Sequence, residues 1–414
     1  MKVAIIGGGA AGLMTAATLL EAHPETDVFL IEKNDGLGKK VIISGGGRCN
    51  VTTGITDVRT VLTRYPRGNK FLSSAMYAFP PEKVFTWFED HGVPLKVEED
   101  LRVFPQSNDG KDVVGVFERL FETSSVQVWL KANAIRVEKY GEQFQIFFKD
   151  TAEPLVVDRL VLTTGGQAYR HTGSTGDGYA FAQTLGHTIT PLAASLNAFF
   201  TLEKWTAEIS GLSFEKAKIT AKREKSYSWT GPFLFTHKGV SGPAVFAVSG
   251  LVAFELYDQV HPLEISIDLF PDDSPEELLR ALGERIAQTP KKNLPNGLTG
   301  FVPKSLIEIL CHELSFSLEK HAAEFSKKEL LQVVGWLKNI KLHVVARGAG
   351  DEFVTAGGVD LKEVDPSTME SKLCPGLFFA GEILDVDGFT GGFNLQASWA
   401  TGRLVGGSVC AQLP

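Results

Sequence analysis

The N-terminal segment Lys2–Glu32 constrains the fold more than any other part of this 414-residue chain. An apolar run, KVAII, leads into the turn GGGAAG, a helical pattern follows as far as Ala22, and a second apolar run, DVFLIE, ends in an acid. Strand, G-x-G-x-x-G turn, helix, strand and acid in this order are the fingerprint of a dinucleotide-binding unit. The sequence therefore predicts an α/β fold that begins with a Rossmann-like unit.

The residues of this fingerprint have separate expected roles. Gly7 makes the tight turn, Gly9 lets a pyrophosphate approach the backbone, and Gly12 lets the helix pack on the strand. The pyrophosphate meets the unpaired N–H groups at the start of the helix. Glu32 accepts hydrogen bonds from ribose hydroxyls, and because an acid disfavours a 2′-phosphate, FAD or NAD is expected here rather than NADP.

The glycine-rich segment after Glu32, EKNDGLGKKVIISGGGRCN, favours FAD over NAD. A chain that binds NAD usually continues with further strand–helix units, whereas bare backbone suits the long middle and the flat ring of FAD. Two later segments support this interpretation: VLTTGG, residues 161–166, and Gly376–Gly402, which contains a strand and then a helix from Leu395 to about Ser408. The N-terminus of that helix would point its dipole at the flavin.

The expected cofactor contacts fall in five segments. They are Gly7, Gly9, Ala10, Ala11 and Gly12 in the first turn; Glu32, Lys33, Lys39 and Lys40 after the second strand; Ser44, Gly45, Gly46, Gly47, Arg48, Cys49 and Asn50 in the glycine run; Thr164, Gly165 and Gly166; and Gly381, Glu382, Asp385, Gly391, Gly392, Phe393, Asn394 and Leu395 near the C-terminus.

The composition indicates which binding partners and which cellular compartment to expect. The net charge is −8, from 41 Lys and Arg against 49 Asp and Glu, and Lys and Arg do not cluster, so the basic footprint of a nucleic-acid binder is missing. The four cysteines form no C-x-x-C pair and no zinc spacing, which predicts a reducing compartment and no metal site. The N-terminal apolar run is too short for a signal peptide or a membrane span, so a cytoplasmic protein with a small-molecule substrate is expected.

The middle of the chain has a different pattern from its two ends. Short alternating segments such as KAKITAKRE and LEISIDLF indicate an antiparallel barrel, and Ser274 and Ser326 each begin a helical segment with a capping-box sequence. The predicted domains are an FAD-binding domain from residues 1–194 and 346–414, with an insert at 195–345 made of a β-barrel (about 195–272 and 339–345) and a helical part (about 273–338).

These motifs together resemble the HI0933-like flavoprotein family, which includes aminoacetone-oxidase-type enzymes. The matching stretches are SGGGRCN at 44–50, TGG at 164–166, TGSTGDGY at 172–179, LFTHKGVSGPA at 234–244, TAGGV at 355–359, TMESK at 368–372 and the GLFFAGEILDVDG segment at 376–396. The resemblance implies non-covalent FAD, a Rossmann-like domain and an insert with barrel and helical parts. The chain departs from the family at Arg170, where a proline is usual, and at Leu101, where a glycine is usual.

Three side chains are candidates for chemistry. His237 lies in the FTHKGVSGPA motif and is either a proton donor or a brace for a barrel turn. Arg48 either binds an acidic substrate or a cofactor phosphate, or makes a structural ion pair. Cys49 has no second cysteine near it in the sequence, so its expected role is that of a small residue packed against the flavin ring rather than that of a redox thiol.

The predicted function is an FAD-dependent oxidoreductase that transfers a hydride between FAD and a small organic substrate. No second G-x-G-x-x-G follows a strand, so NAD(P)H, if it is the redox partner, would bind transiently, and oxygen is an alternative acceptor. Amine oxidation and double-bond reduction both stay open. A flavin-dependent RNA-modifying protein and a non-catalytic flavin-binding protein are the alternatives, and the oligomeric state is left open.

Overall fold

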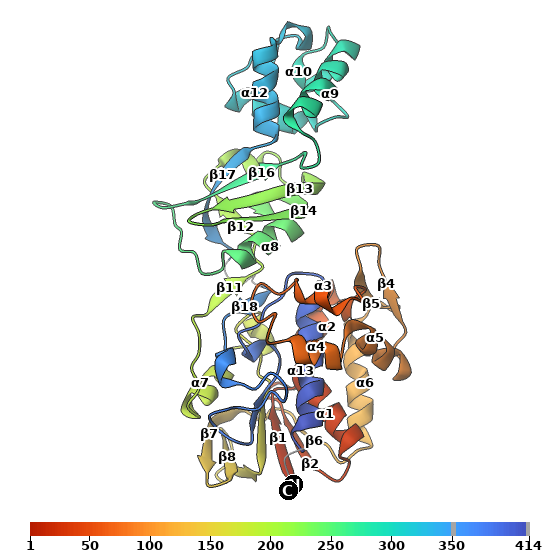
Figure 1. The fold of residues 1–414 in the computed structure, drawn as a ribbon, viewed down its shortest axis with the longest axis vertical. Coiled ribbons are helices and arrows are strands. Elements are labelled where there is room, and N and C mark those ends of the chain that lie inside the picture. The colour runs from red at the N-terminus through yellow and green to blue at the C-terminus, as the bar shows by residue number, and fades with distance from the viewer. Residues whose placement is uncertain (349–352, 411–414) are drawn as a thin grey trace. The chain divides into compact units, whose positions relative to one another are not determined.

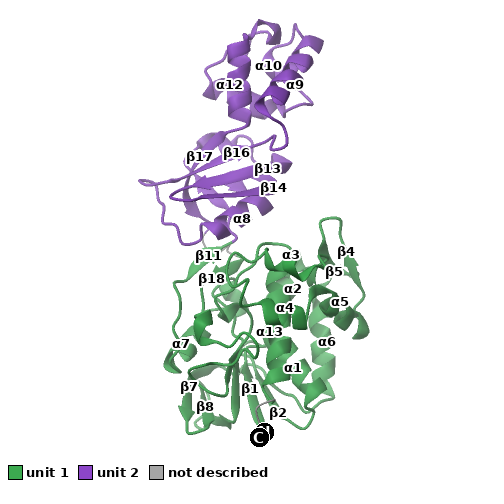
Figure 2. Cartoon of the chain, viewed as in Figure 1, with its two compact units in different colours: residues 1–195, 350–414 green, residues 196–349 purple. Residues whose placement is uncertain are grey.

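A computed structural model of the chain describes residues 1–348 and 353–410. It divides into two compact units, shown in different colours in Figure 2: unit 1 comprises residues 1–195 and 350–414, and unit 2 comprises residues 196–349. The two ends of the chain therefore build one unit, and the middle of the chain is inserted into it.

A five-stranded parallel sheet forms the centre of unit 1 (Figure 1). Its order is β19–β10–β1–β2–β6, with β1 Lys2–Ile6, β2 Asp27–Ile31, β6 Gln127–Trp129, β10 Arg159–Leu162 and β19 Leu377–Phe379. Val3, Ala4 and Ile5 are fully buried, as expected for an apolar run covered on both faces of a parallel sheet. The glycine turn after β1 lies at the carboxyl edge of this sheet, where open α/β sheets bind their ligands.

Two helices from opposite ends of the sequence pack together: α1 (Ala10–Ala22) and α13 (Phe393–Ser408). The contact is close because α13 presents glycines to α1. A Cβ atom on Gly402 would lie 2.5 Å from the carbonyl oxygen of Ala11, and one on Gly406 would lie 2.4 Å from Cβ of Thr18. This packing brings the start of α13 to the same edge of the sheet as the glycine turn.

Smaller elements complete unit 1. Its other helices are α2 Lys39–Ile43, α3 Val58–Leu62, α4 Ser73–Ala78, α5 Pro81–Asp90, α6 Gly110–Glu122 and α7 Asp177–Thr184, with short 3₁₀ turns η1 Ser44–Gly47, η2 Arg170–Thr172, η5 Leu361–Glu363 and η6 Gly381–Ile383. Its small antiparallel sheets are β3–β5–β4 (Thr52–Thr53, Arg102–Pro105, Leu95–Val97), β7–β8–β9 (Ala134–Tyr140, Gln143–Phe148, Leu155–Val157) and β11–β18 (Ala193–Ser195, Val354–Ala356).

Unit 2 contains a closed six-stranded antiparallel barrel. Its order is β12–β15–β14–β13–β16–β17, with β12 Phe199–Thr201, β13 Ser213–Lys222, β14 Ser226–Thr236, β15 Gly239–Ser241, β16 Leu263–Asp268 and β17 Ile340–Arg347. Leu263, Ile265 and Ile267 alternate with partly exposed residues along β16, so one face of the strand fills the barrel interior.

Unit 2 also contains helices, which lie between barrel strands in the sequence. They are α8 Pro243–Leu251, α9 Pro275–Gln288, α10 Leu294–Gly297, α11 Lys304–Glu313 and α12 Lys327–Leu337, with the turns η3 Lys204–Ala207 and η4 Ala322–Glu324. The capping boxes predicted at Ser274 and Ser326 are confirmed, each paired with the glutamate three residues later. Barrel and helices share one continuous apolar core.

The predicted fold class is confirmed: a Rossmann-like α/β domain carries an inserted β-barrel and a helical part. The helix α8 was not predicted from the sequence. Its residues PAVFAVSGL are apolar on every side, and six of the nine are buried, so no amphipathic period marks it.

Candidate functional site

The glycine turn after β1 separates into packed and open positions. A Cβ atom on Gly7 would lie 2.5 Å from the carbonyl oxygen of Thr163, and one on Gly12 would lie 1.9 Å from that of Gly7. A Cβ atom on Gly9 would meet no described atom within 4 Å, and no described side chain caps the helix that starts at Ala10. Gly7 and Gly12 therefore serve packing, whereas Gly9 borders open space at the start of helix α1.

The acid at the end of the second strand is tied to this turn. Glu32 is 8% exposed, and its Oε2 accepts a hydrogen bond from the backbone N–H of Gly8 at 2.8 Å. Its Oε1 accepts from the backbone N–H and the side-chain amide of Asn34, at 2.8 and 2.7 Å. Lys33 points elsewhere, because its Nζ donates to Thr175 and Asp177 of the α7 segment, each at 2.6 Å.

The run SGGGRCN forms a left-handed turn on the surface of unit 1. The φ values are positive at all three glycines: 58° at Gly45, 73° at Gly46 and 89° at Gly47. Residues with a Cβ atom are destabilised in this left-handed region, whereas glycine is not. A Cβ atom on Gly46 or Gly47 would meet no described atom within 4 Å. Cys49 also has a positive φ, 59°, but its side chain is fully buried, and this burial raises the pKa of its thiol to about 12.

The polar residues of this run make contacts within the protein. Arg48 donates a hydrogen bond to Glu98 at 2.7 Å, and its guanidinium lies 3.8 Å from the ring centroid of Phe104. Asn50 Oδ1 accepts from the backbone N–H of Val103 at 3.3 Å, and Ser44 Oγ donates to the carbonyl of Val41 at 2.7 Å. The structure thus gives Arg48 the ion pair that was one of its two expected roles, and the polar side chains brace the open glycines.

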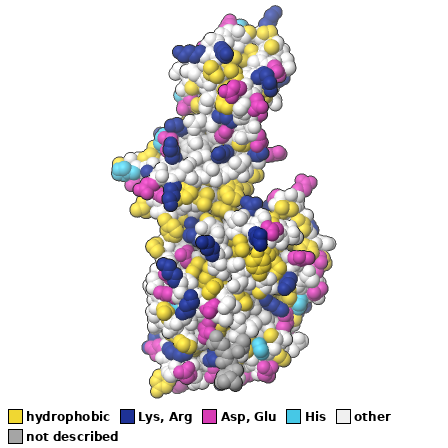
Figure 3. Space-filling view, viewed as in Figure 1, with side chains coloured by type: hydrophobic (Ala, Val, Ile, Leu, Met, Phe, Trp, Pro, Cys, Tyr) yellow, Lys and Arg dark blue, Asp and Glu magenta, His cyan; other side chains and the backbone are white. Residues whose placement is uncertain are grey.

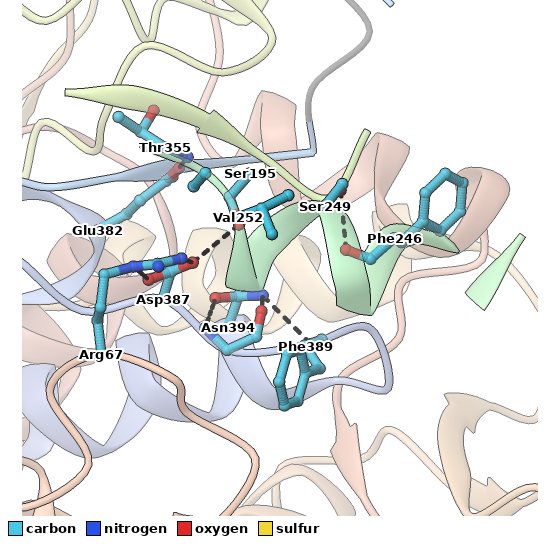
Figure 4. Close-up of polar contacts among 12 residues, drawn as sticks. Arg67, Ser195, Phe246, Ser249, Val252, Thr355, Glu382, Asp387, Phe389 and Asn394 are labelled. Carbon is cyan, nitrogen blue, oxygen red and sulfur yellow. Dashed lines mark hydrogen bonds and ion pairs between the residues drawn. The ribbon is translucent and has the colours of Figure 1, made fainter. Parts of the chain in front are cut away.

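A second polar group joins four segments that are distant in sequence. Lys40 Nζ lies 2.6 Å from Glu382 Oε2. Glu382 Oε1 accepts a hydrogen bond from the backbone N–H of Thr355 at 2.9 Å (Figure 4). Thr355 Oγ1 accepts from the N–H of Gln167 at 2.7 Å, and a Cβ atom on Gly166 would lie 2.5 Å from that oxygen. The expected contacts Lys40, Gly166 and Glu382 therefore do lie together, whereas Lys39 pairs with Asp35 at 2.6 Å.

The start of α13 is held by its own loop. The side chain of Asn394 accepts from the N–H of Gly388 and donates to its carbonyl, each at 2.8 Å, with a longer bond to Phe389 (Figure 4). Gly392 has φ +89°, and a Cβ atom there would lie 2.2 Å from the carbonyl of Thr52, so only glycine fits. Gly391 and Leu395 flank this start, where no described side chain caps the helix.

A buried ion pair that the sequence did not predict joins Arg67 and Asp387. Asp387 is fully buried, Arg67 donates to both of its carboxylate oxygens, and Ser195 Oγ donates to Oδ2 at 2.8 Å (Figure 4). Burial raises the pKa of Asp387, and the guanidinium of Arg67 opposes this. Asp387 follows Asp385 by two residues in ILDVDG, but no sequence signal links Arg67 to it.

The residues at this edge of the sheet fit FAD. Thr164 Oγ1, the hydroxyl of Tyr179 and Asp385 Oδ1 are buried polar atoms to which no described residue gives a hydrogen bond. Burial raises the pKa of Asp385, while hydrogen bonding from Thr190 and the charge of Arg67 lower it. Unsatisfied hydroxyl and carboxylate groups, together with the open space at Gly9, suit a ligand that carries phosphates and sugar hydroxyls. When bound, FAD would supply a two-electron carrier, and these residues would hold and orient it.

His237 belongs to unit 2. It lies in the turn between β14 and β15 and is exposed. Among the described residues, no group of three or more His, Cys, Asp or Glu side chains could hold a metal ion. No helix within residues 1–348 and 353–410 is both long and apolar enough to cross a membrane.

Comparison with known proteins covers nearly the whole chain. The HI0933-like protein Rossmann domain matches residues 1–408. The 3-dehydro-bile acid delta(4,6)-reductase of Clostridium scindens is 28% identical over 98% of both chains, and the ribosomal RNA dihydrouridine synthase of Haemophilus influenzae is 30% identical over 96% of this chain and 95% of its own.

Solved structures share the fold at low identity. The 3-ketosteroid delta1-dehydrogenase of Sterolibacterium denitrificans, in complex with 1,4-androstadiene-3,17-dione, is 11% identical with a TM-score of 0.52 and covers 99% of both chains. A flavocytochrome c3 fumarate reductase is 15% identical with a TM-score of 0.51, over 99% of this chain and 78% of its own. The fold, the site and the match over the whole chain agree, and the protein belongs to the HI0933-like family of FAD-dependent oxidoreductases.

Proposed function

We propose that the protein reduces a carbon–carbon double bond that is conjugated to a carbonyl group, with FAD as the electron carrier. One observation carries this proposal: two relatives that match almost the whole chain are named for such reductions. A delta(4,6)-reductase of a 3-dehydro steroid saturates a bond conjugated to a ketone. A dihydrouridine synthase saturates the ring double bond of uridine, which is conjugated to a carbonyl as well. Of the two reactions that the sequence left open, reduction is therefore favoured over amine oxidation.

The reaction divides into two transfers. The carbon distant from the carbonyl accepts a hydride, the carbon next to it accepts a proton, and two electrons must be resupplied afterwards. We propose NADH or NADPH as the source of those electrons, bound transiently, because the sequence has a single dinucleotide fingerprint. The protein's part is to hold the carrier, to orient the substrate and to supply the proton.

Two side chains have proposed parts in this reaction. His237 is the first candidate for the proton donor, because histidine is the most frequent acid–base residue and its side chain is exposed on the β14–β15 turn. Arg48 is assigned a positioning part, because its contacts with Glu98 and Phe104 brace the glycine run. The variant His237→Gln should lower kcat while flavin content stays unchanged. An unaltered kcat would exclude His237.

The substrate is proposed to be a small cyclic enone. The second candidate, a uridine in ribosomal RNA, is favoured by the name of the relative that is 30% identical. The acidic net charge of −8 weighs against RNA, and on the face shown in Figure 3 the Lys and Arg side chains are interspersed with Asp and Glu. Both candidate reactions use the same cofactor and reduce a conjugated double bond.

The visible spectrum of the purified protein is the first test. Twin flavin bands that bleach on anaerobic addition of NADH or NADPH, and return when a 3-oxo-4-ene steroid or another cyclic enone is added, are the expected result. Bands that no nicotinamide bleaches, but that a small amine does, would overturn the reductase proposal in favour of amine oxidation. Bands that no reductant changes would favour a non-catalytic flavin protein.

A second experiment tests ribosomal RNA as the alternative substrate. Reduced protein would be incubated with protein-free ribosomal RNA and, separately, with cyclic enones, and the products analysed by mass spectrometry. Dihydrouridine formation, a gain of two hydrogens at one nucleotide, without enone turnover would replace the small-molecule substrate with RNA. Enone turnover without any gain of mass in RNA supports the primary proposal.

A further inference from the structure

Three unsatisfied polar groups of unit 1 come from segments that pack together beyond the carboxyl end of β10. Thr164 follows β10, Tyr179 lies in the first turn of α7, and Asp385 follows η6. A Cβ atom on Gly178 would lie 1.9 Å from Thr164 Oγ1 and 3.0 Å from a methyl group of Ile383. Glycine at 178 therefore lets α7 lie against both of the other segments.

The hydroxyl of Tyr179 is the most informative of the three. The side chain is 5% exposed, yet its hydroxyl receives and gives no hydrogen bond within the described residues. Nearly all buried polar groups in folded proteins have a partner, so an unpaired phenol marks a place where a ligand or a water completes the structure. Burial, with the negative charges of Glu382 and Asp385, holds the pKa of Tyr179 well above its usual value. The phenol therefore keeps its proton and stays a hydrogen-bond donor.

We propose that Tyr179, Thr164 and Asp385 form a subsite that binds the hydroxyl groups of the ribitol chain of FAD. The inference rests on the family's cofactor, adds Tyr179 as a direct contact, and assigns the expected contacts Thr164 and Asp385 to the ribitol. A phenol donates, a carboxylate accepts, and a threonine hydroxyl does both. Sugar-alcohol hydroxyls also donate and accept, so the chain can satisfy all three groups at once.

The local charge selects the ribitol over the other parts of the cofactor. Asp385 and Glu382 would repel a phosphate, and the nearby cations Lys40 and Arg67 are already paired, with Glu382 and Asp387. The ribose of the adenosine half is expected at Glu32, which follows β2 and belongs to another part of the sheet edge. The ribitol is the remaining part of the cofactor, and its neutral hydroxyl groups can pair with both the Tyr179 hydroxyl and the Asp385 carboxylate.

The test measures FAD affinity and stability of the full-length protein. Flavin would be removed, and FAD rebinding followed by quenching of its fluorescence for the wild type and for Tyr179→Phe. The variant should bind FAD about 3- to 10-fold more weakly, the loss expected for one neutral hydrogen bond. Without FAD, its melting temperature should equal or exceed that of the wild type, because the change removes an unsatisfied hydroxyl.

Ribityl-modified cofactors locate the contact. FAD analogues that each lack one ribityl hydroxyl would be titrated against both proteins. For one analogue, wild type and Tyr179→Phe should bind equally, because the partner of the phenol is already missing. If all analogues and FAD show the same affinity difference, the phenol contacts another part of the cofactor and the ribitol assignment is wrong.

Tyr257→Phe is the matched control in unit 2. The hydroxyl of Tyr257 accepts a hydrogen bond from Arg347 Nε at 2.6 Å, so this variant should lose stability without FAD and keep wild-type FAD affinity. Equal FAD affinity of Tyr179→Phe and wild type would overturn the subsite while leaving the proposed reductase function intact. A wild-type protein that binds no FAD would overturn the subsite together with the cofactor on which it rests.

Discussion

The backbone N–H of Gly8 donates a hydrogen bond to Glu32 Oε2 over 2.8 Å, so the glycine turn after β1 and the acid after β2 fix each other's position. The same carboxylate receives two further hydrogen bonds from Asn34. In this structure Glu32 organises the turn itself, in addition to the ribose contact expected from the sequence. The two roles are compatible because each carboxylate oxygen has more than one lone pair.

Replacement of Glu32 by glutamine should therefore affect stability as well as flavin binding. One side-chain oxygen becomes an NH₂ group that faces a backbone or amide donor, and an unmade buried hydrogen bond costs about 1–3 kcal/mol. Urea unfolding of the flavin-free protein measures this cost. Glu25→Gln, at an exposed carboxylate, is the control and should change stability by less than about 0.5 kcal/mol. Equal stability of the two variants would contradict the organising role of Glu32.

The two glycines Gly9 and Gly12 should respond differently to the same change. Gly9→Ala places its methyl in open space at an ordinary φ of −85°, so the protein should fold normally but lose FAD affinity. Gly12→Ala places a methyl 1.9 Å from a carbonyl oxygen and should lower the melting temperature with or without FAD. Thermal melts and FAD titrations separate the effects. Gly283→Ala, in the middle of α9 where a Cβ atom also meets no described neighbour, should leave FAD affinity unchanged and should not lower the melting temperature, because alanine favours a helix over glycine.

Substitution at Gly46 tests whether the glycine run lies against the flavin. Gly46→Val should give colourless protein if the ring or ribitol occupies the open space beside it. Because φ is +73° there, valine also adds backbone strain, typically about 1–2 kcal/mol. Gly92→Val, at φ +82° in equally open surroundings, is the control for strain alone and should stay yellow. Full flavin content in Gly46→Val would show that the cofactor does not approach this turn.

The thiol of Cys49 should be chemically inert in the folded protein. Burial raises its pKa to about 12, so the reactive thiolate is absent at neutral pH, and alkylation at pH 8 should reach Cys410 before Cys49. Mass mapping after iodoacetamide treatment measures the order. The raised pKa also sets the sign of the pH effect on stability. The folded state favours the protonated thiol, so the free energy of unfolding is unaffected by this group below about pH 9, the pKa of the unfolded thiol, and falls as pH rises from there toward 12. Rapid labelling of Cys49 would revive the redox interpretation.

The sequence determined the Rossmann-like unit and the capped helices because their signals are local. A strand, a glycine turn and a helix within residues 2–22 depend on neighbours a few residues apart, and so do the capping boxes at Ser274 and Ser326. Leu101 illustrates a local departure with a visible consequence. It stands where the family has glycine, and its φ of 64° is the value that glycine would adopt without strain.

The tertiary structure alone decided which polar groups meet. Arg67 and Asp387 are 320 residues apart, Lys40 and Glu382 are 342 apart, and Gly8 and Glu32 are brought together only when β1 and β2 pair. The same holds for the unpaired hydroxyl of Tyr179, since a tyrosine in TGSTGDGY carries no mark of its burial or of a missing partner. The physical reason is that hydrogen bonding and desolvation depend on distances set by sheet order and helix packing, which short-range sequence patterns do not encode.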